Sequence, residues 1–451
     1  MNLILKWLYP GLGVKRWILL AVLGIILLGT GIAVLLDFTI WFQLMQTAGT
    51  TAIGYLGGQL SRFFAILTAI LGLIFLIISL RRLVQSLLLG FLPGNENKVV
   101  EILYHQRRLK QGPKITAIGG GTGLSVLLRG LKKYTSNLTA VVTVSDNGGS
   151  SGRLRGELGI LPPGDARNCL VALADTESLM EEMFNYRFDK GALEGHSLGN
   201  LLLAAMTDIT GNFDSAVQEI SKVLAVRGQV FPSTLCDVGL KARMTDGSWV
   251  NGETELVEHP GKIERIFLEP HDAEVLPEVL RQIAEADAVV LGPGSLYTSI
   301  IPNLLLKGMI SALQKTKAPV FYVCNVMTQP GETDGYTVAD HVRAINYHTG
   351  ASLIDYVLIN NREVSPQAAA KYSHQQSFPV IIDEKELMDL DVILITDELI
   401  DDTAVVRHQH EKLARRLVKE IFRANSMVER LRMLNAYLGH RLKGIGEDVG
   451  G

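Results

Sequence analysis

Two long apolar runs stand out near the N-terminus of the chain. The run from Trp17 to Leu36 holds no charged side chain, and neither does the run from Phe63 to Leu80. An α-helix needs about 20 apolar residues to cross the ~30 Å hydrocarbon core of a bilayer, and both runs have about that length. We therefore predict transmembrane helices at about 17–36 and 61–80, within a membrane anchor formed by residues 1–90. A cleaved signal peptide is disfavoured because a second span follows the first.

The charges that flank these runs predict an orientation. Lys15 and Arg16 precede the first run and Arg81 and Arg82 follow the second, whereas the loop from Asp37 onward has no lysine or arginine before residue 62. Lysine and arginine close to membrane spans remain on the cytoplasmic side. The pattern predicts a multi-pass protein of the cell membrane whose N- and C-termini are both cytoplasmic.

Beyond a juxtamembrane linker at 91–113, short β-branched runs alternate with amphipathic stretches. We expect strands at 114–118, 138–145, 288–291, 320–324, 356–359, 380–383 and 392–396. Helices are expected at 124–133, 166–174, 178–187, 198–209, 215–226, 277–285, 302–314, 338–348 and 407–422. Such alternation is typical of an α/β fold in which a parallel sheet carries helices on both faces. Short polar strands between 232 and 269 predict a small antiparallel insertion. The α/β domain should extend over 114–425, before a C-terminal helix and tail at 426–451.

Composition narrows the function classes. The formal net charge is −3, from 43 basic and 46 acidic residues, and this balance gives no concentrated basic surface for nucleic acid. Cys169, Cys236 and Cys324 lie far apart in apolar stretches, without the paired spacing of a zinc site or a disulfide framework. We predict a reducing compartment, no nucleic-acid partner and no metal site built from cysteines.

A glycine-rich loop follows the first expected strand of the domain. The strand ends in Gly119, Gly120, Gly121, Thr122 and Gly123, and leucines at helical spacing come next. Strand, tight turn and helix N-terminus together direct free backbone N–H groups at one point, which favours an anion. The loop lacks the lysine of a P-loop and the third glycine of a dinucleotide-binding loop, so it predicts phosphate binding without identifying the nucleotide.

A second such loop follows the next strand. It contains Asp146, Asn147, Gly148, Gly149, Ser150 and, shortly after, Arg153. Asp146 lies 23 residues beyond Gly123, about where a dinucleotide fold places the acid that holds a ribose, although an Asx turn or a helix cap would also explain an aspartate there. Parallel strands bring such loops to the carboxyl edge of the sheet, where open α/β folds bind ligands.

Two further helix starts carry candidate ligand contacts. Arg167 lies in the first turn of the helix expected at 166–174, where a cation opposes the helix dipole unless an anion is near, and Asp165 is placed to cap that helix. His196 and Asn200 lie around the start of the helix at 198–209, where Ser197 is the expected cap. A buried structural histidine is the competing interpretation of His196.

A third loop resembles the first in composition. It follows the strand at 288–291 and contributes Gly292, Gly294, Ser295, Tyr297, Thr298 and Ser299. The next strand ends at Asn325, which should reach the same edge. Glycines and hydroxyls at a helix N-terminus offer hydrogen-bond donors but no general base, so the loop suits binding more than proton transfer. The sequence has no H-E-x-x-H motif. We predict no catalytic residue and no metal ligand.

Six segments, taken in order, resemble the YvcK family, also called the gluconeogenesis factor family, a branch of the CofD-like superfamily. They are AIGGGTGLSVLLRGLK, TVSDNGGSSGRLR, LPPGDARNCLVALAD, HSLGNLLLAAM, DGSWVNGE and LGPGSLYTSIIPNLL. The resemblance extends over about 114–425 and implies a Rossmann-like, CofD-type fold. It also implies a binder of a UDP-sugar of the UDP-N-acetylglucosamine type, associated with cell shape and cell-wall precursor supply during gluconeogenic growth. The predicted hairpin is an addition to the shorter members.

On this resemblance the three glycine loops would hold the diphosphate, and Asp146 would accept a hydrogen bond from a ribose or sugar hydroxyl. No cofactor is required, although Mg²⁺ is compatible with a diphosphate ligand. Expected partners are the UDP-sugar, the cytoplasmic membrane, a second copy of the chain and proteins of cell-wall synthesis.

Three other functions remain open. The first is a 2-phospholactate-transferase-type enzyme, in which Asp146 would act as a base or a metal ligand. The related transferases have consecutive aspartates at this point, whereas Asn147 follows Asp146 here. The others are an NAD-dependent oxidoreductase and a membrane scaffold with a vestigial nucleotide site. We favour a non-catalytic nucleotide-sugar-binding regulator.

Overall fold

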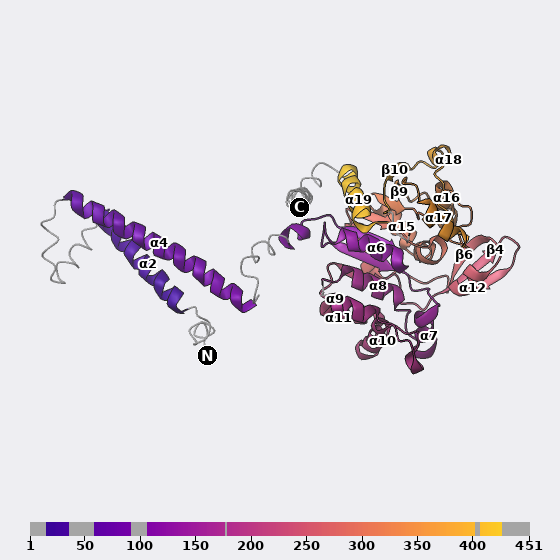
Figure 1. The fold of residues 1–451 in the computed structure, drawn as a ribbon, viewed down its shortest axis with the longest axis horizontal. Helices are drawn as coiled ribbons and strands as arrows, with labels where there is room; N and C mark the ends of the chain where they lie inside the picture. The colour runs from indigo at the N-terminus through magenta and orange to yellow at the C-terminus, as the bar shows by residue number, and fades with distance from the viewer. Residues whose placement is uncertain (1–14, 36–57, 92–105, 176–177, 402–405, 426–451) are drawn as a thin grey trace. The chain divides into compact units, whose positions relative to one another are not determined.

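The computed structural model describes residues 15–35, 58–91, 106–175, 178–401 and 406–425 (Figure 1). Contacts divide the chain into two compact units, Met1–His105 and Gln106–Gly451. The helix and tail expected at 426–451 lie outside the described residues, as does most of the linker at 91–113.

The first unit is a pair of antiparallel helices, α2 (Lys15–Leu35) and α4 (Gly58–Phe91). Within them, Arg16–Leu35 and Phe63–Leu83 are long and apolar enough to cross a membrane, as the hydrophobic runs predicted. Most of their large apolar side chains are exposed, including Leu19 at 69% and Leu80 at 65%. An exposed apolar surface of this extent marks a site of interaction with another protein or with a membrane.

Glycines allow the two helices to approach closely. A Cβ atom placed on Gly72 would lie 2.5 Å from the backbone nitrogen of Leu28 and 2.8 Å from the carbonyl oxygen of Gly24. A Cβ on Gly31 would lie 2.7 Å from the carbonyl oxygen of Ala65. Helices in lipid associate through such small-residue contacts because burying apolar surface gives no advantage there.

The second unit is built on a parallel sheet of seven strands in the order β10-β9-β8-β7-β1-β2-β3. Their bounds are β1 (Ile115–Gly119), β2 (Leu138–Val142), β3 (Gln229–Pro232), β7 (Ala288–Leu291), β8 (Val320–Val323), β9 (Tyr356–Asn360) and β10 (Ile393–Asp397). The central strands are buried along their whole length, as expected for a parallel sheet covered on both faces.

The strand order reverses between β1 and β7. From β1 the chain adds β2 and then β3 on one side, and from β7 it adds β8, β9 and β10 on the other. Ile115 therefore pairs with Leu138 of β2 and with Ala288 of β7. Open α/β sheets bind ligands at such a topological switch point, outside the carboxyl ends of the strands.

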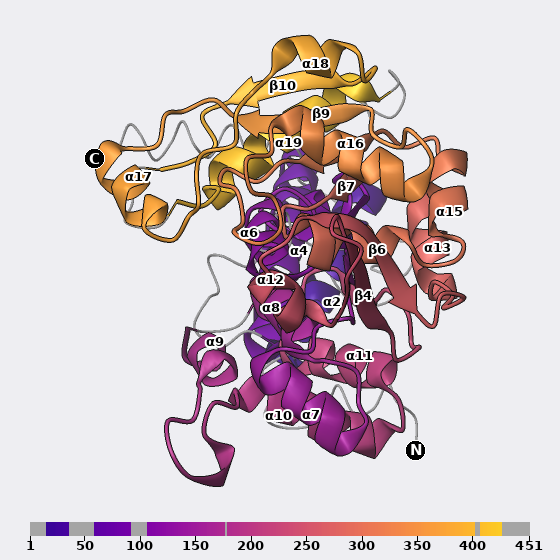
Figure 2. The same ribbon diagram turned by 90° about the vertical axis from the view of Figure 1, so that its right-hand side faces the viewer.

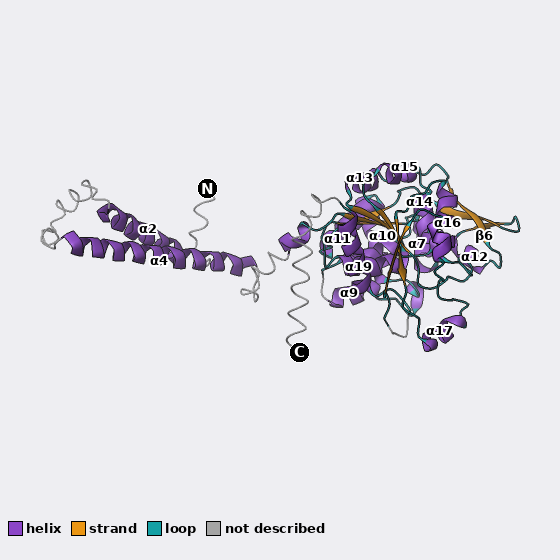
Figure 3. Cartoon of the chain, turned by 90° about the horizontal axis from the view of Figure 1, so that it is seen from above, coloured by secondary structure: helices purple, strands orange, loops and turns teal. Residues whose placement is uncertain are grey.

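Helices cover both faces of the sheet. Helices α13 and α15 lie on one side, and α19 and α9 lie on the other (Figures 2 and 3). The bounds are α6 (Gly121–Leu131), α7 (Gly149–Leu158), α8 (Gly164–Leu173), α9 (Ser178–Asn185), α10 (Leu198–Thr210), α11 (Phe213–Val223), α13 (Pro277–Glu285), α14 (Ile301–Leu304), α15 (Met309–Lys315), α16 (Val338–Thr349), α17 (Pro366–Ser373), α18 (Glu384–Met388) and α19 (His410–Ala424).

The small antiparallel insertion is present. Strands β4 (Gly239–Met244), β5 (Trp249–Asn251) and β6 (Ile263–Glu269) form a sheet in the order β5-β4-β6, and α12 (Glu253–Glu258) follows β5. His348 joins this sheet to α16, because its Nε2 accepts a hydrogen bond from the Ile266 backbone nitrogen at 3.0 Å.

Some local expectations were wrong. Residues 380–383 form no strand: Ile381 makes an isolated bridge with Thr337, and the preceding Pro379 makes one with Met327. The helix expected at 302–314 is split into α14 and α15, and a π-helix, η3 (Leu296–Ile300), precedes them. Asp165 does not cap α8: Pro163 is at the N-cap position, and Asp165 lies in the first turn.

Candidate functional site

The loops that follow β1 and β7 touch at the switch point. A Cβ on Gly119 would lie 3.6 Å from the Cα of Gly292. A Cβ on Gly123 would lie 2.5 Å from the carbonyl oxygen of Pro293, which is closer than a real side chain permits. Gly292 also has a φ of +77°, in the left-handed region that favours glycine. Glycine is therefore required here so that two backbone turns can meet.

A cavity of about 520 Å³ opens beside these two loops, and its size is typical of a small-molecule site. We call it the glycine-loop cavity. It is lined by Gly120–Gly123, Val126, Glu253, Pro293, Gly294, Ser295, Thr298, Ser299, Asn325, Val326, Met327, Thr328, Gln329, Pro330, Glu332, Tyr372, Gln375, Ser377, Val406, Arg407 and His408. The first and third predicted loops and Asn325 thus share one cavity.

Hydrogen bonds hold the third loop in shape. The Ser295 hydroxyl accepts from the backbone nitrogen of Thr298 at 3.1 Å and donates to the Glu332 carboxylate. The Asn325 side-chain amide donates to the carbonyl oxygen of Gly294 at 2.8 Å. Asn303 donates to the carbonyl oxygens of Gly119 at 3.1 Å and Ser299 at 2.7 Å. These bonds make the loop a preformed wall of the cavity.

Carboxyl groups lie in and beside the cavity: Glu253 and Glu332 line it, and Asp165 lies behind Gly120, whose Cβ would be 2.3 Å from Asp165 Oδ2. Burial, and after it the charge of Asp146, raises the pKa of Asp165 to about 7. Burial, and after it the charge of Asp146, also raises the pKa of Glu253 to about 8. A hydrogen bond from Thr298 acts in the opposite direction and lowers it. Burial also raises the pKa of Glu332. The raised pKa values favour the protonated, uncharged forms of Asp165 and Glu253 near neutral pH, compared with exposed carboxyl groups.

The second glycine loop is placed differently. Asp146 Oδ1 accepts from the backbone nitrogen of Gly148 at 2.8 Å, which is an Asx turn. Asn147 Oδ1 accepts from the backbone nitrogen of Glu253 at 3.1 Å and so ties this loop to the start of α12. The loop then enters helix α7 at Gly149.

Gly149, Ser150 and Arg153 line a separate cavity of about 830 Å³. We call it the arginine cavity, and it is lined by Gly149, Ser150, Arg153, Arg187, Gly191, Ala192, Glu194 and Gly195. His196 and Asn200 contact it through Ser150, whose hydroxyl lies 3.0 Å from His196 Nδ1 and accepts from Asn200 Nδ2 at 3.1 Å. Among the described residues, this set shares no member with the lining of the glycine-loop cavity.

Arg167 and Tyr297 line neither cavity. Arg167 donates to the Ser197 hydroxyl at 2.5 Å, and Ser197 caps α10 as expected. Tyr297 is buried in the core, where its hydroxyl lies 2.7 Å from that of Tyr336. Burial, and next Tyr336, raises the pKa of Tyr297. Its side chain packs the fold beneath the loop.

The structure adds residues that the sequence did not single out, above all Glu253, Glu332, Arg407 and His408. Glu253 begins α12 of the insertion, and Glu332 lies in the segment after β8. Arg407 and His408 precede α19, and burial lowers the pKa of His408 to about 4. None of these residues belongs to a glycine loop. The described part of the chain brings no three histidine, cysteine, aspartate or glutamate side chains together as metal ligands.

The family model of the 2-phospho-L-lactate transferase CofD matches residues 115–400. A putative gluconeogenesis factor from Nostoc sp. is 48% identical over 422 residues, which cover 92% of each chain. The gluconeogenesis factor of Bacillus subtilis is 52% identical over 310 residues, covering 68% of this chain and 98% of that protein. Some relatives thus match nearly the whole chain, and others match about two thirds of it.

The fold has also been solved in a relative. A crystal structure of a UPF0052-family protein from Bacillus halodurans matches with a TM-score of 0.66 and 50% identity, covering 67% of this chain and 98% of that one. These matches confirm the resemblance that the six sequence segments indicated.

Proposed function

Because the chain belongs to the gluconeogenesis factor family of CofD-like proteins, we propose that it binds a UDP-sugar of the UDP-N-acetylglucosamine type in its glycine-loop cavity and acts as a non-catalytic regulator. The regulated process is the supply of cell-wall precursors, and with it cell shape, during gluconeogenic growth.

One observation carries the proposal. The glycine-loop cavity lies at the switch point between β1 and β7, where two glycine loops present backbone N–H groups and hydroxyls to the same space. Helix α6 begins at Gly121, so its N-terminus adds a favourable dipole for a diphosphate. Arg407 lines the same cavity and supplies a positive charge.

The carboxyl groups fit a ligand that carries both phosphate and hydroxyl groups. Ionised carboxylates would repel a diphosphate, but the raised pKa values of Asp165 and Glu253 reduce their charge near neutral pH. A protonated carboxyl can donate a hydrogen bond as well as accept one. The pair therefore suits the ribose or sugar hydroxyls.

Calorimetry of the full chain in detergent, titrated with UDP-N-acetylglucosamine, tests the proposal. We expect saturable binding that Gly123→Val abolishes, because its side chain would meet the carbonyl of Pro293. Gly156→Val is the control, since a Cβ at Gly156 meets nothing within 4 Å. No heat at millimolar ligand, with an intact melting transition, would reject the proposal.

A 2-phospholactate-transferase-type enzyme remains the alternative, since the matching family model is named for that transferase, but this name does not favour it over the regulator. Asp146 would then serve the reaction, together with Mg²⁺, which commonly binds one or two carboxylates plus substrate phosphates. Turnover of a deazaflavin acceptor that is lost in Asp146→Asn would establish the enzyme and replace the regulator.

For the first unit we propose a membrane anchor, with both termini in the cytoplasm. Its support is the apolar surface of α2 and α4 and the basic residues beside them. Deletion of residues 1–90 should release the protein from the membrane fraction, and a deletion variant that still fractionates with membranes would contradict the anchor. Partners in cell-wall synthesis and a second copy of the chain also remain proposals.

A further inference from the structure

The arginine cavity contains positive charge without a carboxylate partner. Arg153 Nη2 donates to the carbonyl oxygen of Glu194 at 2.6 Å, and Arg187 Nη1 donates to the carbonyl oxygen of Gly195. Among the described residues, neither guanidinium forms an ion pair. The two carbonyls orient the guanidiniums but do not neutralise them.

A third arginine adds to this charge. Arg167 donates to Ser197 at 2.5 Å and to Asn168 at 2.7 Å, both neutral groups, and its buried Nε has no acceptor in the described part of the chain. Burial, and next the positive charge of Arg187, lowers the pKa of Arg167. Among the described residues, none of the three guanidiniums forms an ion pair, although the charge of Asp165 acts on Arg167.

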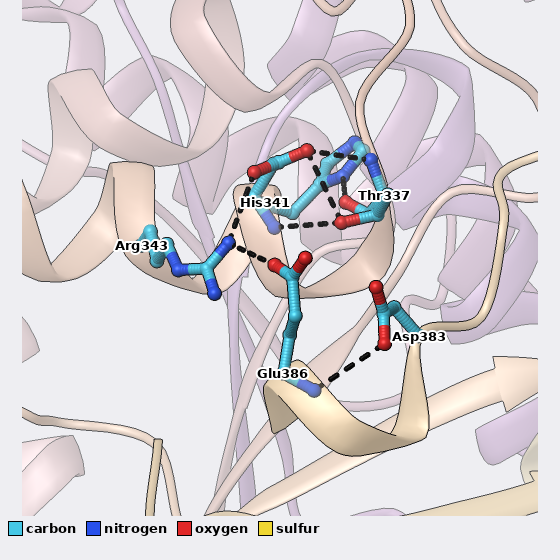
Figure 4. A network of polar contacts seen from close by, with 6 residues as sticks. Thr337, His341, Arg343, Asp383 and Glu386 are labelled. Atoms are coloured by element: carbon cyan, nitrogen blue, oxygen red, sulfur yellow. Dashed lines mark hydrogen bonds and ion pairs between the residues drawn. The ribbon is translucent and has the colours of Figure 1, made fainter. Parts of the chain in front are cut away.

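Other arginines of the same unit have acidic partners. Arg343 bonds to Asp340 at 3.3 Å and to Glu386, inside a network that also fixes the start of α16 (Figure 4). Arg129 pairs with Glu181 at 2.6 Å. Arg153 and Arg187 are exposed and have no such partner among the described residues, and an anionic ligand would supply the missing charge.

Neutral donors face the same space. Helix α7 begins at Gly149, so the backbone N–H groups of its first turn have no partner within the helix. Ser150 is 5% exposed, and its hydroxyl is held by the buried Asn200 and His196. Among the described residues that line the arginine cavity, Glu194 is the one with a carboxylate, and it is exposed.

We propose that the arginine cavity is a second ligand site, separate from the glycine-loop cavity, that binds a small phosphorylated metabolite such as a sugar phosphate. Two guanidiniums, a serine hydroxyl and helix N–H groups provide more donors than the two oxygens of a carboxylate need, whereas a phosphate monoester offers three. The volume of about 830 Å³ leaves room for the sugar part of the ligand. The Glu194 carboxylate can accept hydrogen bonds from the sugar hydroxyls.

The test uses the full chain in detergent and calorimetric titration with inorganic phosphate and with glucose 6-phosphate. The double variant Arg153→Gln/Arg187→Gln should raise the dissociation constant at least ~10-fold, because it removes two charge-assisted contacts. Arg343→Gln removes a paired arginine far from the cavity and should leave binding unchanged. A melting curve of each variant confirms that it is folded.

Binding of glucose 6-phosphate should persist in saturating UDP-N-acetylglucosamine and in Gly123→Val. Unchanged affinity in the double arginine variant would overturn the second site. Displacement by the UDP-sugar, or loss in Gly123→Val, would also overturn it, because both ligands would then share one site. If only the UDP-sugar fails to bind, the proposed function fails and the second site stands.

Discussion

The side-chain amide of Asn303 donates a hydrogen bond to the carbonyl oxygen of Gly119 at 3.1 Å, from a position with no solvent exposure. The same amide donates to Ser299 at 2.7 Å. One buried asparagine thus joins the end of β1 to the loop after β7, which are the two sides of the glycine-loop cavity.

Replacing this asparagine should affect both stability and binding. Asn303→Leu preserves the approximate volume but removes one donor from the carbonyls of Gly119 and Ser299, and the carbonyl of Gly119 keeps its bond from the backbone nitrogen of Thr143. We expect a loss of about 1 kcal/mol in the free energy of unfolding, because the substitution also removes the buried Asn303 Oδ1, which has no hydrogen-bond partner among the described residues. Affinity for UDP-N-acetylglucosamine should fall as well, because the loops on either side would no longer be fixed relative to one another. Urea unfolding and calorimetry measure the two effects.

Asn137 offers a matched control. Its amide also donates to two carbonyl oxygens, those of Lys110 at 2.9 Å and Gly112 at 2.8 Å, but at the opposite edge of the sheet. Asn137→Leu should lower stability and leave the affinity unchanged. Equal losses of affinity in both variants would show that Asn303 acts through general stability alone.

Glu253→Gln should stabilise the protein at alkaline pH. The folded pKa of Glu253 is about 8, above the ordinary value of 4.5, so the unfolded chain releases this proton at lower pH than the folded protein does. The carboxyl therefore destabilises the fold increasingly from about pH 4.5 to about pH 8, and by a constant amount above that. The variant should melt about 2–5 °C higher at pH 9 and equally at pH 4.

Glu255 lies two residues further along the same short helix and is exposed. Glu255→Gln should show no comparable pH-dependent difference in melting temperature. A Glu253→Gln variant that melts at the wild-type temperature across the whole pH range would show that Glu253 is not held in a charge-disfavouring environment.

The sequence predicted the three glycine loops because each combines an apolar strand with glycines and a helical pattern. It did not predict which strands are neighbours. Strand order depends on packing between segments far apart in the chain, so the contact between Gly123 and Pro293 was not visible before the sheet was known. The sequence analysis expected all three loops at one site. In the structure the first and third loops line the glycine-loop cavity, and part of the second loop lines the arginine cavity.

Helix α7 was missed because its sequence, GSSGRLRGEL, begins with glycines and serines and contains a further glycine, which all lower helix propensity. Close packing of the backbone favours this helix. A Cβ on Gly152 would lie 1.9 Å from the carbonyl oxygen of Asn147, so only glycine allows this turn. Glu253 was missed for a different reason. It reaches the cavity only because Asn147 holds the start of α12, a contact across 106 residues.

Acid should detach the small antiparallel sheet first. His348 Nδ1 lies 2.7 Å from the carbonyl oxygen of Ala344, and its Nε2 accepts from Ile266, so the ring must be neutral with its proton on Nδ1. Burial lowers the pKa of His348 from its ordinary 6.5. The unfolded chain therefore binds a proton that the folded protein does not, and stability falls as the pH drops below about 6.5.

Hydrogen exchange measured between pH 7 and pH 5 should show earlier loss of protection in β6 (Ile263–Glu269) than in β1. His348→Gln should reduce this pH dependence, whereas His374→Gln, at an exposed position, should not. Simultaneous loss of protection in both sheets would assign the acid sensitivity to the whole unit.

The helical hairpin should depend on Gly72 and not on Gly29. A side chain at Gly72 would meet the backbone of α2 at 2.5 Å, whereas a Cβ at Gly29 meets nothing within 4 Å. Spin labels on the exposed residues Leu19 and Leu80, in a Cys236→Ser background, would report the distance between the helices through dipolar broadening. In bilayers, Gly72→Leu should reduce the broadening and Gly29→Leu should preserve it, because helix association in lipid depends on close backbone contact. Equal broadening in the two variants would mean that the glycine contact does not hold the hairpin together.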